Sequence, residues 1–510
     1  MDGLLLAIVL AASPQAARST PPPTVPSTFG LDEEVQRLAQ GTGLRKARLS
    51  VSVRDERGRP VVDLRADEPM APASNMKLLT TGAALATLGP DFSFQTRLLR
   101  NGDTLTVVGD GDPAFGDPEL LESMVVSDGA GGTREGVKAD ELLDLWARAV
   151  KAEGMDRVRT LLVDDRIFAR EFVPAGWPKD QLNERYCAEV CGLNFHLNRL
   201  HIWPRPGAQR PELARVEPAA PSLPIAVKAT QKTGRKDENA VWISRSRDSN
   251  DLALNGNVKS AFSAPVPAVV HDMPSVFGEM LAARLRAAGV SVDAVRLAGE
   301  SDPPPAGRPV GPVFRTPIAT ALQRANTDSE NIYAECLLKR AAWTPGAPPV
   351  TWSAATAWLS GKVRGAIGDD AGSLVANDGS GLSRTNRVTA DALTEWLHWV
   401  ESQPSLSGPF MESLAVGGRT GTVRKRFRDL DPALATVQCK TGYVDGVSAL
   451  SGFVTLADGR RWTFSVLGNG LSEPSAVAKT KQFQEQVVRA VARAMGTSRP
   501  RAGESALGGG

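Results

Sequence analysis

Residues 435–467 read ATVQCKTGYVDGVSALSGFVTLADGRRWTFSVL, and this stretch decides the fold class. It contains three segments with the residue pattern of strands, namely Ala435–Cys439, Ser448–Leu456 and Trp462–Leu467. Asp458-Gly459 supplies a turn between the last two segments. Adjacent strands joined by short turns pair in the antiparallel sense, so the stretch predicts three neighbouring strands of one antiparallel sheet.

The N-terminal part of the chain adds a hairpin to this sheet. Leu49–Arg54 and Val61–Leu64 alternate in polarity around the turn Arg57-Gly58-Arg59, as paired strands do. Helices are expected around these strands, at Leu31–Ala39, Asn75–Leu88, Pro317–Asn326, Glu330–Ala342 and Ser475–Met495. The sequence therefore predicts an antiparallel sheet built from both halves of the chain.

A long interruption separates the two halves of this pattern. Residues 96–299 carry helix and strand signals in alternation, with several Gly/Pro breaks, and the Pro-rich segment Pro303–Pro312 follows them. Strands are expected at Thr104–Val108, Val158–Val163 and Ala240–Ser244, and helices at Leu142–Ala152 and Met280–Ala288. We interpret residues 96–299 as an insertion.

The composition is that of a soluble globular protein with more than one domain. The chain has 510 residues, of which 42% are hydrophobic and 23% charged. Its 59 basic and 57 acidic residues leave a net charge of +2, which gives no support to a nucleic-acid partner. The histidines are scattered outside the spacings of metal sites, at His196, His201, His271 and His398, so we expect no metal.

Four cysteines are too few for a disulfide framework in a chain of this length. Cys187 and Cys191 are close enough in sequence to form a bridge within a loop. The alternative is that these two, together with Cys336 and Cys439, are buried thiols.

The N-terminus carries a signal-like apolar run. Leu4–Ala12 reads LLLAIVLAA, the length of a secretory hydrophobic region, and a Pro/Thr/Ser linker follows it, although a basic region and an A-x-A site are missing. No later run reaches 18 apolar residues, so no internal transmembrane helix is expected. We expect residues 1–28 to direct export to the periplasm or cell envelope, with peripheral association with membrane or cell wall left open, and residues 497–510 to form a disordered tail.

Ser74-Asn75-Met76-Lys77 places a hydroxyl and an amine three residues apart at the start of a predicted helix. That spacing puts both groups on one helix face. A serine hydroxyl becomes a nucleophile when a neighbour takes its proton, and a lysine with a depressed pKa can do so. Taken alone, Ser74 would more often be a helix N-cap.

Two further motifs follow in the chain. Ser329-Glu330-Asn331 sits between two predicted helices, where its hydroxyl and amide could reach a cleft, or where Ser329 could cap a helix. Lys440-Thr441-Gly442 follows a predicted strand and offers a cation, a hydroxyl and a glycine that lets a ligand approach the backbone. A second copy, Lys232-Thr233-Gly234, precedes a run of charged residues and is interpreted as a solvated loop.

The ordered set S-x-x-K, S-x-N and K-T-G resembles the signature of penicillin-binding proteins and serine β-lactamases. Ser329 lies 255 residues after Ser74 (329 − 74), and this long interval resembles the class C low-molecular-mass penicillin-binding proteins, the D-alanyl-D-alanine carboxypeptidase/endopeptidase family. The likeness covers roughly Leu31 to Met495, and other segments agree with it, namely Pro72–Leu78, Gly109–Pro113, Asp378–Arg384, Gly417–Thr422 and Lys440–Gly452.

The resemblance implies an α/β (α+β) fold with a discontinuous transpeptidase-like domain. Residues 29–95 and 300–496 would form that domain, with insertion domains in 96–299. The substrate would be a peptidoglycan stem peptide ending in D-Ala-D-Ala, and β-lactam antibiotics would be covalent inhibitors. No cofactor would be needed. Two alternatives are a serine β-lactamase and a non-catalytic cell-wall binding protein.

The resemblance also implies roles for single residues. Ser74 would attack the substrate carbonyl, and Lys77, kept neutral by the nearby charge of Lys440, would accept its proton. Ser329 would relay a proton to the leaving amine and Asn331 would bind the substrate amide. Lys440 and Thr441 would bind the terminal carboxylate of the substrate, and Gly442 would lie beside them in the substrate site. The backbone N–H of Tyr443 would join that of Ser74 in an oxyanion hole. The family usually has Thr or Ser where this chain has Tyr443, and the Asp378–Arg384 loop is expected to be structural.

Overall fold

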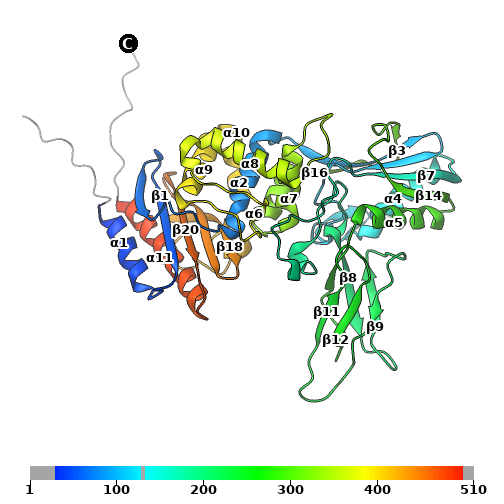
Figure 1. Ribbon diagram of the computed structural model, residues 1–510, viewed down its shortest axis with the longest axis horizontal. Helices are drawn as coiled ribbons and strands as arrows, with labels where there is room; N and C mark the ends of the chain where they lie inside the picture. Colours follow the sequence, from blue (N-terminus) through cyan, green and yellow to red (C-terminus); the bar gives the residue numbers. More distant parts are fainter. Residues whose placement is uncertain (1–28, 128–131, 498–510) are drawn as a thin grey trace, which may run out of the picture.

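A six-stranded antiparallel sheet forms one end of the molecule, which this computed structural model describes over residues 29–127 and 132–497 (Figure 1). The sheet combines the two predicted sequence regions, because the N-terminal hairpin pairs with the last of the C-terminal strands. Its strands, in spatial order, are β17 (Ala415–Val416), β18 (Ala435–Val444), β19 (Val447–Leu456), β20 (Arg461–Asn469), β1 (Arg48–Arg54) and β2 (Pro60–Leu64). The predicted sheet is therefore confirmed.

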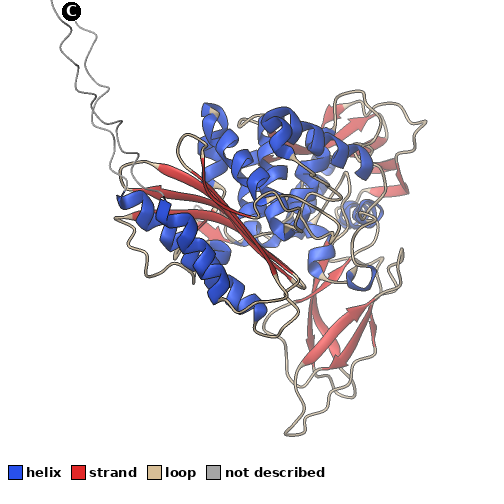
Figure 2. Ribbon diagram, turned by 60° about the vertical axis from the view of Figure 1, so that its left-hand side comes forward, coloured by secondary structure: helices blue, strands red, loops and turns tan. Residues whose placement is uncertain are grey.

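Helices cover both faces of this sheet (Figure 2). On one face, α1 (Phe29–Gly41) and α11 (Ala476–Thr497) pack against side chains such as Phe464 and Val466. On the other face, Phe453 and Leu467 join the core of a helical cluster. Because both faces are covered, β19 and β20 are buried almost throughout, and their buried polar side chains bond one another, as Ser451 and Ser465 do at 2.9 Å.

The helical cluster surrounds α2 (Met76–Leu88), which is buried from Met76 to Leu85. The helices around it are α6 (Ile318–Asn326), α7 (Asn331–Ala342), α8 (Trp352–Ile367), α9 (Ala390–Ser402) and α10 (Pro404–Glu412). Trp396 of α9 is fully buried and donates its indole N–H to the carbonyl of Leu78 at 2.9 Å. Any polar side chain on the first turns of α2 is consequently held inside the protein.

The inserted part has a second sheet of mixed direction. Its central strands are parallel and are connected through α4 (Ala139–Ala152) and α5 (Met273–Ala287), whereas β3 and β4 are antiparallel. The strands are β14 (Ser291–Leu297), β7 (Arg157–Asp164), β4 (Thr104–Val108), β3 (Ser93–Asn101), β15 (Arg308–Pro309) and β16 (Phe314–Pro317). An apolar core of its own lies between this sheet and the two helices.

Smaller elements complete the inserted part. Two three-stranded sheets extend away from the helical cluster (Figure 1), one with β8 (Arg199–Arg205), β9 (Glu212–Glu217) and β13 (Val266–Val269), the other with β10 (Ala226–Val227), β11 (Ala240–Ser244) and β12 (Ala253–Asn257). This part also contains a short helix, α3 (Pro118–Glu122), and two paired short strands, β5 (Val125–Ser127) and β6 (Thr133–Glu135).

The chain passes between the two parts at β3 and at β15 and β16, because both later strands pair with β3. The domain limits expected from the sequence, 29–95, 96–299 and 300–496, stay predictions. The signal-like residues 1–28 and nearly all of the expected tail, 497–510, lie outside the described residues. Within the described part, no helix is both long and apolar enough to cross a bilayer.

Two local expectations change in the structure. Lys440-Thr441-Gly442 does not follow a strand but lies inside β18, which continues to Val444. All four cysteines are buried free thiols, so the Cys187–Cys191 bridge is not formed and the buried-thiol alternative holds.

Candidate active site

Ser74 stands where a single 3₁₀ turn, Ala73–Asn75, leads into α2. Ala73 has a positive φ of 46°, an unusual conformation for a residue with a side chain. The helix N-cap is Asn75, and it makes no side-chain capping bond. The Ser74 hydroxyl is half-buried and instead contacts Lys77, so the interpretation of Ser74 as a helix cap is wrong.

The Lys77 amine is fully buried and has three oxygen neighbours. Its Nζ lies 3.1 Å from Ser74 Oγ, 2.7 Å from Asn331 Oδ1 and 3.0 Å from the carbonyl oxygen of Ser380. Burial is the main cause that lowers the pKa of Lys77 from 10.5 to about 8, while nearby carboxylates oppose the change. We expected repulsion from Lys440 to lower the pKa of Lys77, and this expectation is corrected, because desolvation is the largest cause of the lowered pKa.

The Asp378–Ser383 loop packs closely against the turn that carries Ser74. Gly381 has a φ of +84°, and a Cβ added to it would lie 1.8 Å from the carbonyl oxygen of Ala73. Only glycine can occupy that position without moving the turn. The loop is thus structural, as expected, and it also supplies the Ser380 carbonyl to Lys77.

Ser329 and Lys440 form the second polar pair of the site. Ser329 has a φ of +67°, and its Oγ accepts a hydrogen bond from Lys440 Nζ at 2.8 Å. Glu330, not Ser329, is the N-cap residue of α7, so Ser329 does not cap a helix. Lys440 is fully buried, and burial together with the charge of Lys77 holds its pKa well below the usual range.

The strand that carries Lys440 is open along one side at this point. The short strand β17 pairs only with Cys439 and Gln438, so within the described residues β18 has no strand partner on that side from Lys440 onward. Thr441 shares a hydroxyl–hydroxyl hydrogen bond of 2.8 Å with Thr422. The backbone after Lys440 therefore faces the pocket.

A glycine is needed at position 442 for a different reason from the one expected. A Cβ at this position would lie 2.8 Å from the carbonyl oxygen of Pro72 and 2.9 Å from Asn75 Oδ1. The space beside the glycine is thus taken by the turn that carries Ser74 and not left for a ligand. Gly442 lets β18 approach the nucleophile's turn.

Ser74, Ser329 and Asn331 line a pocket of about 460 Å³, and the buried amines of Lys77 and Lys440 contact these lining residues. Tyr443 forms part of its wall, and 59% of this residue is exposed. The lining also includes residues of the inserted part that sequence reasoning did not find, because nothing in their local pattern marks them: Pro178, Gln181, Arg185 and Tyr186. The site is therefore built by both parts of the chain.

The segment from Trp177 to Tyr186 makes specific contacts with residues around Lys77. The carbonyl of Tyr186 accepts a hydrogen bond from Asn331 Nδ2 at 2.9 Å, which orients the Asn331 oxygen toward Lys77. On the other side of the amine, Trp177 Nε1 donates to Asp378 Oδ2 at 3.0 Å. The inserted part thus fixes two of the residues that surround the amine.

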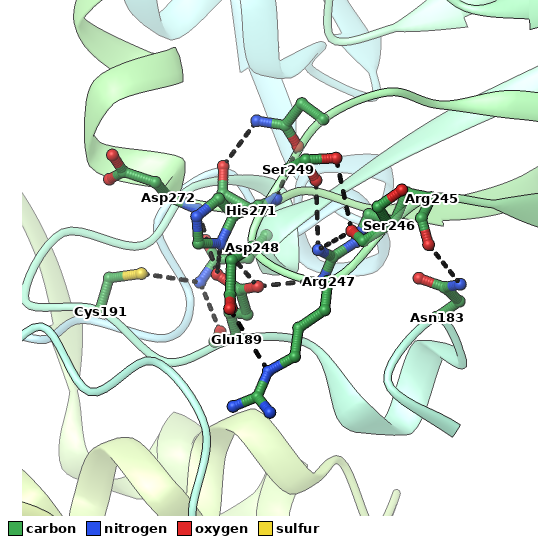
Figure 3. A network of polar contacts seen from close by, with 12 residues as sticks. Asn183, Glu189, Cys191, Arg245, Ser246, Arg247, Asp248, Ser249, His271 and Asp272 are labelled. Atoms are coloured by element: carbon green, nitrogen blue, oxygen red, sulfur yellow. Dashed lines mark hydrogen bonds and ion pairs between the residues drawn. The ribbon is translucent and has the colours of Figure 1, made fainter. Parts of the chain in front are cut away.

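A buried network holds the end of this segment in place (Figure 3). Glu189 accepts hydrogen bonds from Arg245 at 3.0 Å and from the backbone N–H of Asp272 at 3.1 Å, and it contacts His271 Nδ1 at 3.0 Å. Asn183 donates to the Arg245 carbonyl at 3.5 Å. The network connects the Tyr186 segment to the N-terminus of α5 and the end of β11.

The second K-T-G copy does not take part in the site. Lys232, Thr233 and Gly234 are exposed in an irregular segment between β10 and β11, whereas Lys440 is buried and donates a hydrogen bond to Ser329. The choice of Lys440 over Lys232 therefore agrees with the geometry.

The chain matches the D-Ala-D-Ala carboxypeptidase 3 (S13) family over residues 31–493. It belongs to that family. The protein is accordingly a serine-type D-Ala-D-Ala carboxypeptidase, a peptidoglycan-acting hydrolase with the fold of a penicillin-binding protein. Because peptidoglycan lies in the cell envelope, the S13 enzyme acts there.

Relatives and solved structures agree with the S13 assignment. The chain is 31% identical over 475 residues to a D-alanyl-D-alanine carboxypeptidase of Actinomadura sp. (strain R39), covering 88% of this chain and 82% of the relative. It is 24% identical to D-alanyl-D-alanine carboxypeptidase DacB of Haemophilus influenzae, with 83% and 85% covered. The crystal structure of penicillin binding protein 4 from Haemophilus influenzae has a TM-score of 0.71 at 21% identity, with 90% and 99% covered, and shows the same fold.

We expect Gly381→Ala to slow D-Ala release by about tenfold or more, since the new Cβ must displace the Ser74 turn and small displacements of reacting groups are costly. Release of free D-Ala from a D-Ala-D-Ala peptide measures the effect. The matched control is Gly361→Ala on the exposed face of α8, where nothing lies within 4 Å. A wild-type rate in Gly381→Ala would contradict the role of the loop.

Proposed function

We propose that Ser74 is the nucleophile of this carboxypeptidase and that Lys77 accepts its proton. The contact of 3.1 Å between Ser74 Oγ and the buried Lys77 amine carries the proposal. A neutral amine has two N–H donors and one lone pair. When Asn331 and the Ser380 carbonyl accept the two N–H groups, the lone pair is left to face the Ser74 hydroxyl.

The reaction then follows acyl transfer through a serine ester. Ser74 Oγ attacks the carbonyl carbon of the penultimate D-Ala while its proton moves to Lys77. The backbone N–H groups of Ser74 and Tyr443 bind the developing oxyanion, a role supported by the open side of β18. The C–N bond breaks, D-Ala leaves with a proton on its amine, and water hydrolyses the acyl-enzyme.

The second polar pair serves the leaving D-Ala. Ser329 accepts a hydrogen bond from Lys440 and lies in the pocket, so it can pass a proton to the leaving amine. Lys440 and Thr441 bind the terminal carboxylate, whose negative charge favours the protonated form of Lys440. Asn331 takes a different role from the one expected: both ends of its amide already bond protein groups, Lys77 and Tyr186, so it orients the base.

The substrates follow from this chemistry. A stem peptide ending in D-Ala-D-Ala loses its terminal residue, and a cross-linked peptide, whose leaving group is the amine of a neighbouring stem, is hydrolysed by the same steps. β-Lactams acylate Ser74, a proposal supported by the β-lactam complex of penicillin binding protein 4 from Haemophilus influenzae, which shares the fold at a TM-score of 0.68. The apolar run Leu4–Ala12 would direct export to the periplasm.

A penicilloyl ester on Ser74 should persist, because the carboxylates among the pocket-lining residues, Asp328, Glu330 and Asp445, each pair with an arginine. Glu335, on the α7 helix that follows the S-x-N motif, is fully buried. Both of its oxygens already accept backbone N–H groups, from Gly379 and Ser380. This favours slow release of penicillin over β-lactamase activity, while D-Ala departs and leaves room for water.

Treatment with penicillin should add one adduct to the wild-type chain and none to Ser74→Ala, because among residues 29–127 and 132–497 the Lys77 amine hydrogen-bonds one hydroxyl, that of Ser74. Intact mass measures the adduct, and its decay is followed beside steady-state release of D-Ala. We expect a long-lived adduct with repeated peptide turnover. An adduct on Ser74→Ala, or rapid adduct loss without D-Ala release, would refute the assignment.

Lys440→Ala should raise the free-energy barrier to acylation by roughly 3 kcal/mol, about a hundredfold in rate, since it removes the amine that is protonated when a carboxylate binds. The paired control is Lys232→Ala in the exposed K-T-G copy, where a surface change stays within about 0.5 kcal/mol. Stopped-flow acylation by a fluorescent penicillin compares the two variants. Equal rates for Lys440→Ala and wild type would reverse the choice of motif.

A further inference from the structure

Glu335 holds the loop that contacts the Lys77 amine. Its Oε2 accepts the N–H of Gly379 at 2.7 Å and its Oε1 accepts the N–H of Ser380 at 2.8 Å. Two hydrogen bonds to successive peptide groups fix the orientation of those peptides. The next carbonyl along, that of Ser380, is the one that accepts from Lys77. This carbonyl belongs to the following peptide, whose N–H, that of Gly381, donates to Asp378 Oδ1, so Glu335 and Asp378 hold the two peptides on either side of Ser380.

Glu335 also belongs to the helix that presents Asn331. The two residues are four apart on α7, so both project from one face of the helix. Asn331 contacts Lys77 directly, and Glu335 reaches it through the loop. One helix thus sets two of the three oxygen neighbours of the amine.

An ion pair does not account for the burial of Glu335. The side chain is fully buried, and among residues 29–127 and 132–497 no Lys or Arg forms an ion pair with it. A buried carboxylate without an ion pair is costly, and a loop could be fastened by a neutral side chain. Among the carboxylates that raise the pKa of Lys77, Glu335 has the largest effect. Burial and the nearby charge of Asp378 raise the pKa of Glu335 itself to about 8.

The loop is fastened at its other side by Asp378. Its Oδ1 accepts from the N–H of Gly381 and from Asn386 Nδ2, and its Oδ2 accepts from Ser383 N–H and Trp177 Nε1. A Cβ on Gly379 would lie 3.0 Å from the carbonyl oxygen of Ala334 and 3.1 Å from Glu335 Oε2, so the loop packs directly on α7. Asp378 and Glu335 together therefore set how the Ser380 carbonyl faces Lys77.

We propose that Glu335 is a positioning residue of the carboxypeptidase reaction, which together with Asp378 aligns the Ser380 carbonyl with Lys77 and, when ionised, favours the charged form of the amine. The inference rests on the proposed role of Lys77 as proton acceptor. Glu335 touches neither the substrate nor Ser74 and works through Lys77 alone.

The charge of Glu335 acts on Lys77 among several groups. Asp378 in the loop and Glu330 at the start of α7 also favour the charged amine, whereas Lys440 on β18 repels it. Removing the Glu335 charge makes the ammonium form less stable, so the pKa of Lys77 falls. Since acylation requires the neutral amine, the acid limb of its pH profile then moves to lower pH.

The test is the acylation rate of the full chain by a fluorescent penicillin, measured from acid to alkaline pH, in wild type and Glu335→Gln. Glutamine keeps the size but loses the charge and one of the two N–H acceptors. We expect a plateau about ten- to a hundredfold lower, because the amine is misplaced, and a midpoint about one pH unit lower, because the opposing charge is gone. A merely structural role lowers the rate at every pH and leaves the midpoint unchanged.

Two further variants complete the design. Glu401→Gln makes the same chemical change at a half-buried carboxylate that pairs with Arg461 at the end of α9, and it should retain the wild-type profile. Glu335→Asp keeps the charge on a shorter side chain, so the midpoint should stay near wild type while the plateau falls.

The outcomes separate this proposal from the assignment of Ser74 and Lys77. An unchanged midpoint or an unchanged plateau in Glu335→Gln overturns the role of Glu335 even if Ser74 alone carries the adduct. If glutamine prevents folding, judged by thermal unfolding, Glu335→Asp decides, and a wild-type plateau in that variant overturns the proposal. A wild-type profile without any acid limb would instead refute Lys77 as the base.

Discussion

Burial of one amine, that of Lys77, is the constraint on which the rest of the site depends. An amine removed from water needs an acceptor for every N–H group and is more easily neutral than charged. The fold supplies Asn331 from α7 and the Ser380 carbonyl from a loop, and Ser74, on the turn that leads into α2, completes the set. Each of these elements is far from the others in sequence, so the complete fold is needed to bring them together.

A second buried amine makes the arrangement sensitive to charge. Lys440 is also fully buried, and each lysine disfavours the charged form of the other. Two carboxylates oppose this repulsion, because Glu335 and Asp378 favour the protonated form of Lys77. The balance keeps one amine free to accept a proton from Ser74 and leaves the other ready to meet a substrate carboxylate.

Much of this could be predicted from the sequence, for physical reasons that also limit it. Strand alternation and turns define the sheet, and the motif order identifies Ser74, Lys77, Ser329 and Lys440 as a set, because these features are local. The contacts of Trp177 and the other residues of the inserted part depend on how it packs on the helical cluster, so no local pattern could indicate them. The sequence shows that Glu335 lies four residues after Asn331 and so on the same helix face, but it does not show which groups surround the Glu335 side chain. The reason for Gly442 was likewise hidden, since its neighbour, the Pro72 carbonyl, comes from a distant segment.

The pH dependence of Ser74 acylation in the wild-type chain tests the central claim most directly. If neutral Lys77 takes the proton, the rate constant for acylation by penicillin rises about tenfold per pH unit at acid pH and levels off, and its midpoint lies where burial sets the pKa of Lys77, about 8. Lys77→Ala should lose this dependence together with nearly all of the rate. A wild-type rate that does not change between about pH 6 and about pH 9 would contradict the account.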